Sequence, residues 1–240
     1  MAHGAIRSGY ASLAERLNRF PQGAPPSELL FKILKILLSE EEAALVAQLP
    51  IRPFTAQKAA RIWKRSPAQA QRALDALAAR SFLLDVRKDG QTRYFLPPPM
   101  AGFFEFSLMR LRGDIDQKAL AELFYQYLNV EEDFVRALFT DGETQLGRVF
   151  VHEGALGEKE ALTVLDHERA SEVVRGASAI GVGVCYCRHK MAHLGRACDA
   201  PLDICMTFGT CAESLTRHGT ARPADASECL ELLAAARERG

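Results

Sequence analysis

Hydrophobic positions in the first third of the chain recur at the three-to-four-residue spacing of amphipathic helices. The apolar series Leu29–Leu38 begins just after Ser27, a residue type that caps helix N-termini. A second helix is predicted over residues 40–49, and a third over 56–64 with Thr55 as its cap. The pattern therefore predicts three consecutive helices.

A fourth helix and a β-hairpin are predicted next. The dipeptide Ser66-Pro67 supplies an N-cap and a first-turn proline. Asp89-Gly90 then separates two β-prone runs, 82–86 and 92–96, which is a strong hairpin signal. Helices, a short helix pair and a terminal hairpin, in this order, predict a winged helix-turn-helix over residues 1–98.

After residue 96, the pattern of hydrophobic and polar residues predicts helices interrupted by one short strand. Pro97-Pro98-Pro99 favours a stiff, extended linker and so a domain boundary. Ala179–Val184 has the composition of a buried strand and leads directly into a cysteine. We expect a mainly α (α+β) protein with a winged-helix domain at 1–98, a helical connecting region at 99–165 and a cysteine-rich domain at 166–240. Helical segments are predicted at 103–112, 116–127, 131–139, 166–177, 201–218 and 224–238.

Composition is that of a globular protein, with 48% hydrophobic and 25% charged residues in 240. No apolar run approaches the ~20 residues of a membrane span, and no signal peptide is evident, so we expect a cytoplasmic location.

The net charge of zero conceals an uneven distribution of charge along the chain. Residues 1–100 carry 15 Lys and Arg against 8 Asp and Glu, whereas 101–165 carry 6 against 12. The basic and acidic parts are expected to meet different partners, or each other.

Four of the six cysteines fall within 21 residues, at the spacing C-x-C-x10-C-x6-C. Cys185 and Cys187 are expected to point the same way from an extended segment, and Cys205 to lie near the first turn of the helix 201–218. With Cys198, they form the donor set of a zinc ion or an iron–sulfur cluster. The chain lacks the paired C-x2-C motifs of structural zinc sites. The spacing therefore favours a cluster over zinc, with a metal-free set as the third alternative.

Basic residues surround these cysteines and extend the candidate cofactor-binding set. Arg188 can donate to cluster sulfur or remain an ordinary surface arginine. His193 can replace a thiolate ligand, although a role beside the ligands or at the surface is favoured. Cys211 and Cys229 are expected to be buried free cysteines, with Cys211 near enough to serve as a spare ligand.

Three stretches closely resemble the ferredoxin-type 4Fe–4S proteins of bacteria and archaea. They are Ile180–Phe208, with its C-Y-C-R-H-K and I-C-M-T-F motifs, Leu96–Arg110 and Ala14–Pro26. The resemblance implies iron–sulfur binding and electron transfer. Members of that family continue into C-x-x-C-x-x-C motifs, which this sequence lacks. The resemblance therefore supports one cluster between Cys185 and Cys205, and not a dicluster.

Three functions follow as hypotheses. The leading one is an electron relay with one [4Fe–4S] cluster in a larger redox assembly, whose partner is a ferredoxin or an oxidoreductase subunit. The second is a transcription regulator whose cluster controls DNA binding by the winged helix, and the third is a zinc-stabilised interaction module. We expect no enzyme, because the sequence has no P-loop, G-x-S-x-G, H-E-x-x-H or dinucleotide fingerprint.

Overall fold

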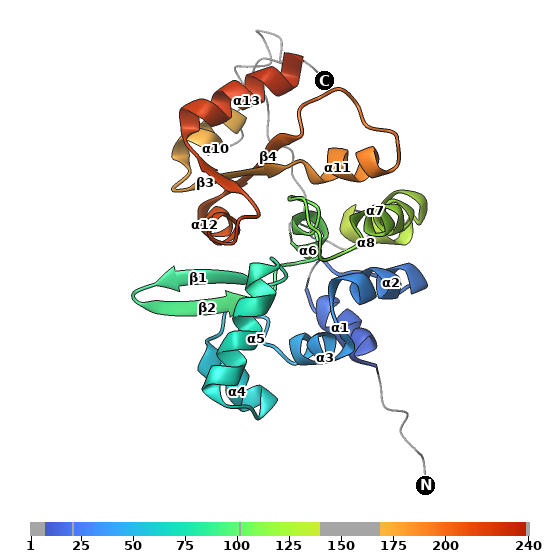
Figure 1. The fold of residues 1–240 in the computed structure, drawn as a ribbon, viewed down its shortest axis with the longest axis vertical. Helices are drawn as coiled ribbons and strands as arrows, with labels where there is room; N and C mark the ends of the chain where they lie inside the picture. The colour runs from blue at the N-terminus through green and yellow to red at the C-terminus, as the bar shows by residue number, and fades with distance from the viewer. Residues whose placement is uncertain (1–7, 21, 101, 140–168, 239–240) are drawn as a thin grey trace.

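The computed structural model describes residues 8–20, 22–100, 102–139 and 169–238 (Figure 1). Over these residues the protein is mainly helical with two small antiparallel sheets, which confirms the α+β class. None of the helices described there is both long and apolar enough to cross a membrane. Part of the predicted connecting region, 140–165, lies outside the described residues. The helices are α1 (Gly9–Leu17), α2 (Glu28–Leu37), α3 (Glu40–Ala47), α4 (Ala56–Trp63), α5 (Pro67–Ala79), α6 (Phe103–Phe106), α7 (Gln117–Tyr125) with the π-helical turn η1 (Gln126–Val130), α8 (Asp133–Phe139), α10 (Ala170–Gly176), α11 (Tyr186–His193), α12 (Gly209–Arg217) and α13 (Ala226–Glu238); the strands are β1 (Leu84–Lys88), β2 (Gln91–Phe95), β3 (Ile180–Val184), β4 (Asp203–Phe208) and β5 (Arg222–Ala224).

Side-chain caps fix the starts of the N-terminal helices where they were predicted. The Ser27 hydroxyl accepts a hydrogen bond from the backbone N–H of Leu30 at the start of α2. Thr55 caps α4 in the same way. Ser66 and Gln69 cap α5 reciprocally, each side chain accepting from the other residue's N–H. These caps satisfy N–H groups that have no partner inside the helix.

The predicted β-hairpin is confirmed. Strands β1 and β2 pair antiparallel beside α5 (Figure 1). Asp89 and Gly90 form the turn with φ values of 52° and 71°, the left-handed conformation that a tight hairpin of this hand requires. Phe54 pairs with Tyr94 of β2 through backbone N···O distances of 2.9 and 2.7 Å. The segment between α3 and α4 therefore adds a single β-bridge at the edge of the hairpin.

The part after the proline segment differs from the prediction in several elements. The helix predicted at 103–112 spans only Phe103–Phe106, and helix α11 and strand β5 were not predicted. Residues 201–218 were expected to be helical, but 203–208 form strand β4, and α12 begins only at Gly209. The three-stranded sheet has the order β4-β3-β5. Strand β3 carries Gly181 and Gly183, where an added Cβ would lie 3.0–3.3 Å from neighbouring atoms, so only glycine fits without adjustment. The strands that pair in this sheet are distant from one another in the sequence, so the local hydrophobic pattern did not predict their pairing.

One hydrophobic core runs from α1 to α12. It includes residues on both sides of the proline segment, and Phe82 stacks on Phe103 with ring centroids 4.7 Å apart. Pro97 and Pro99 are buried. A smaller second cluster lies between α10, β3 and α13. The division into three domains stays a prediction, while packing joins the first hundred residues closely to those that follow.

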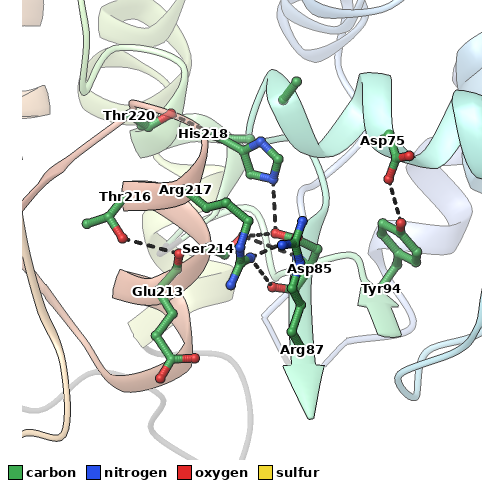
Figure 2. A network of polar contacts seen from close by, with 12 residues as sticks. Asp75, Asp85, Arg87, Tyr94, Glu213, Ser214, Thr216, Arg217, His218 and Thr220 are labelled. Atoms are coloured by element: carbon green, nitrogen blue, oxygen red, sulfur yellow. Dashed lines mark hydrogen bonds and ion pairs between the residues drawn. The ribbon is translucent and has the colours of Figure 1, made fainter. Parts of the chain in front are cut away.

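A buried carboxylate joins the hairpin to α12 (Figure 2). Asp85 of β1 is 3% exposed. It accepts a hydrogen bond from the Ser214 hydroxyl at 2.7 Å, and its other oxygen lies 2.8 Å from Nη1 of Arg217. Nε2 of His218 lies 3.0 Å away. Because all these partners come from one end of α12, this network, here called the Asp85 clamp, fixes the hairpin against the cysteine-bearing part.

Candidate metal centre

Strand β3 delivers Cys185 to the start of α11. Cys185 is the N-cap of this helix, and its backbone N–H donates to the carbonyl of Leu202 at 2.6 Å. Cys187 was predicted to continue an extended segment, but it lies in the first helical turn and is exposed. The extended geometry is therefore wrong at this point. Cys187 is nevertheless adjacent, because its side chain hydrogen-bonds that of Cys185.

The two thiols of this pair titrate very differently. The hydrogen bond from Cys187 lowers the pKa of Cys185 to about 6, against an opposing effect of burial. The backbone N–H and the charge of Arg188 lower it further. The same hydrogen bond is the main cause that raises the pKa of Cys187 strongly. Within the pair, the thiol of Cys185 is therefore the more readily ionised.

Cys205 reaches the same region from β4 and not from a helix, which corrects the predicted position. Its backbone pairs with Gly183 of β3, next to an irregularity in the register. Burial raises the pKa of Cys205 to about 12, and the charges of Glu105 and Cys185 add to this. The backbone N–H of Tyr186 acts in the opposite direction. Three of the predicted ligands thus come from the end of β3, the start of α11 and the middle of β4.

Cys198 lies apart from these three, exposed on the loop between α11 and β4. The end of the loop is fixed beside Cys185, because Arg188 donates to the carbonyl of Pro201 at 2.6 Å. Four Cα–Cα steps separate Cys198 from Leu202, a span of at most ~14 Å. Over the described residues, no three His, Cys, Asp or Glu side chains are arranged to hold a metal ion. A shared site therefore requires the loop of Cys198 to close and the side chains of Cys185, Cys187 and Cys205 to draw together.

The cations next to the cysteines have partners of their own. The guanidinium of Arg188 donates a hydrogen bond to the Pro201 carbonyl, and its positive charge lowers the pKa of Cys185. Lys190 donates to Asn129 at 2.6 Å and lies over the Tyr186 ring. Burial lowers the pKa of Lys190, and the charge of Cys187 partly restores it. These two cations lie where they offset negative charge on sulfur.

His193 has its ring against a second histidine. Its Nε2 lies 3.1 Å from Nε2 of His189, whose Nδ1 lies 2.7 Å from the carbonyl of Leu108. Burial, and then the charge of His189, lowers the pKa of His193. The structure therefore places His193 beside His189, and its role as a ligand stays a prediction.

Glu105 belongs to this region although the sequence argument did not place it there, and Cys211 lies there as that argument expected. Glu105 of α6 raises the pKa of Cys187, Cys205 and Cys211 by its negative charge. Cys211 is half-buried in the first turn of α12, and burial is the main cause that raises its pKa to about 11. The signal for Glu105 was a single carboxylate within the apolar run F-F-E-F. Cys229, by contrast, is buried in the second cluster, as expected.

Comparison with models of known protein families, with curated proteins and with solved structures gave no match. The resemblance to ferredoxin-type proteins therefore stays a prediction from the sequence motifs.

Proposed function

We propose that the protein binds one [4Fe–4S] cluster through Cys185, Cys187, Cys198 and Cys205 and relays single electrons within a larger redox assembly. The observation that supports this is backbone proximity: β3 leads into Cys185 and Cys187 at the start of α11 and pairs with β4 at Cys205, beside the anchored end of the loop that carries Cys198. Their thiols are free. Free thiols at this density suit a reducing compartment such as the cytoplasm.

The residues fit a cluster by their donor chemistry. Cysteine thiolates hold such clusters, and the hydrogen bond from Cys187 lowers the pKa of Cys185 and so favours its thiolate. Backbone N–H groups of Arg188 and Tyr186 favour the thiolates of Cys185 and Cys205. Hydrogen bonds and cations near sulfur stabilise added negative charge. When bound, the cluster supplies reversible one-electron chemistry.

The exposed side of the site suits exchange with a partner. Cys187 and Cys198 are exposed, whereas Cys185 and Cys205 are half-buried against the core. A cluster bound here would be held on its buried side by Cys185 and Cys205, and its side toward Cys187 and Cys198 would lie near the surface. A ferredoxin or an oxidoreductase subunit is the proposed partner.

Residues 1–98 are proposed to form a winged helix, with the helix-turn-helix and wing within residues 40–96. The supporting observations are the order α3, α4, α5, β1, β2 and the additional β-bridge of Phe54 with Tyr94. In this arrangement α5 is the second helix of the helix-turn-helix, and the hairpin is the wing. The Asp85 clamp holds this unit against α12, which follows Cys205 in the chain.

A reductive titration tests the relay function. Anaerobically purified protein is expected to be brown, and dithionite should bleach the colour with uptake of one electron per cluster. Reoxidation by a mild acceptor should restore the colour. Colourless protein containing one equivalent of zinc would instead support the zinc-stabilised module. Visible absorption and electron paramagnetic resonance follow the reaction.

A further inference from the structure

Positive charge is concentrated in residues 51–95, which carry ten Lys and Arg against three Asp and Glu. Two of the three acids are already engaged. Asp85 is held in its clamp with α12. Asp75 accepts hydrogen bonds from the Tyr94 hydroxyl at 2.6 Å and from Gln71 at 2.9 Å. The excess positive charge of this segment therefore remains largely uncompensated.

The cations of the segment are mostly exposed and without acidic partners. Seven of them have exposed side chains and form no ion pair with any residue that the structure describes. Like charges at this density repel one another and are suited to binding a polyanion. They lie before α4, along α4 and α5 and on the hairpin: Arg52, Lys58, Arg61, Lys64, Arg72, Lys88 and Arg93.

A polar hollow of about 480 Å³ brings three of these elements to one face. Thr55 and Gln57 line it from the start of α4, Gln71 from α5, and Gln91 and Thr92 from the tip of the hairpin. Amide and hydroxyl groups of this kind donate to phosphates and read base edges. Several of the unpaired cations directly follow or flank these residues in the sequence.

Hydrogen bonds to Tyr94 hold α5 against β2 on the buried side of this hollow. Tyr94 is 1% exposed beneath α5, and its hydroxyl donates a hydrogen bond to Asp75 of that helix (Figure 2). Gln71 of α5 donates to the same hydroxyl, so both side chains join α5 to β2. Above this support, α5 exposes mostly small side chains with Gln69, Arg72 and the carboxylate of Asp75, which is hydrogen-bonded to Gln71 and Tyr94. A helix with so narrow an exposed side fits the major groove of B-DNA, which is about 12 Å wide.

We infer that α4, α5 and the hairpin tip form a binding face for duplex DNA. Helix α5 enters the major groove, and the hairpin cations Lys88 and Arg93 contact phosphates. The spread of unpaired cations over three elements matches the regular charge of a duplex, and the glutamines match its base edges. This binding needs no cluster, and it goes beyond electron relay.

Fluorescence anisotropy with a labelled duplex of mixed sequence tests this inference on the full chain. With about five phosphate contacts, the affinity should fall several-hundred-fold between about 50 and 200 mM salt. Lys88→Ala with Arg93→Ala should weaken binding at least tenfold at about 50 mM salt and reduce the salt slope by about two. Arg72→Ala should weaken it as well.

The matched control removes two exposed cations elsewhere, by Lys32→Ala on α2 with Lys118→Ala on α7. This variant should bind within about twofold of the unmodified protein, since it leaves the proposed face intact. Circular dichroism confirms that each variant is folded. Absence of DNA binding at about 50 mM salt, or equal losses in both double variants, would overturn the inference and favour a protein partner for this face.

Discussion

Replacing Cys198 with serine is expected to abolish retention of the cluster while leaving the apoprotein as stable as before. The residue is exposed on its loop, so the substitution should change the free energy of unfolding by no more than about 0.5 kcal/mol. Its thiolate is the proposed fourth ligand, and three ligands leave one iron open to water. Iron and acid-labile sulfide, measured per chain after anaerobic purification, should fall to near zero.

Cys229→Ser is the matched control. Cys229 is fully buried in the second cluster, far from the candidate ligands in sequence, and a buried hydroxyl should cost about 1–3 kcal/mol. Cys229→Ser should therefore keep its iron although it is the less stable variant, and Cys198→Ser should lose its iron although its stability is nearly unchanged. Retention of iron by Cys198→Ser, or equal loss in both variants, would contradict the ligand assignment.

Asp85→Ala is expected to lower the free energy of unfolding by about 3 kcal/mol. The substitution leaves the Ser214 hydroxyl and the partly buried Arg217 without their common acceptor. Glu132→Ala, which removes an exposed carboxylate paired with Arg136, should change stability by less than about 1 kcal/mol. Denaturant unfolding at neutral pH measures both. Equal changes in the free energy of unfolding would show that the Asp85 clamp stabilises the fold no more than an exposed ion pair does.

The contribution of Asp85 should also depend on pH. Burial by itself would raise the pKa of Asp85, but the Ser214 hydrogen bond and the charges of Arg217 and His218 outweigh it and lower the pKa. A carboxyl with a lowered folded pKa stabilises fully above its unfolded pKa of about 4 and loses this effect as pH falls further. The difference in stability between the native protein and Asp85→Ala should therefore shrink below about pH 4. A difference that is constant from neutral pH to pH 2 would contradict this account.

The sequence predicted those parts of the fold that local chemistry determines. Ser27, Thr55 and Ser66 fix helix starts through their own side chains, and Asp89-Gly90 fixes the hairpin turn. Each signal lies within a few residues of the structure it specifies. Strand β4 gave no such signal, because it forms by pairing with β3, some twenty-five residues earlier.

The candidate site was predictable in its residue types but not in its geometry. The spacing of the cysteines identified them as a group, yet α11 begins immediately after Cys185, and Cys187 therefore lies on a helix. Glu105 enters the site only because the core folds α6 against it, a long-range effect that no local motif records. The position of Cys198 depends on closure of a loop, which spacing does not specify.

The iron and sulfide content of the anaerobically reconstituted protein tests the central claim most directly. The account predicts about four iron and four acid-labile sulfide per chain, with the brown colour of a cubic cluster. Zinc at one equivalent, or no bound metal after reconstitution with iron and sulfide, would contradict it.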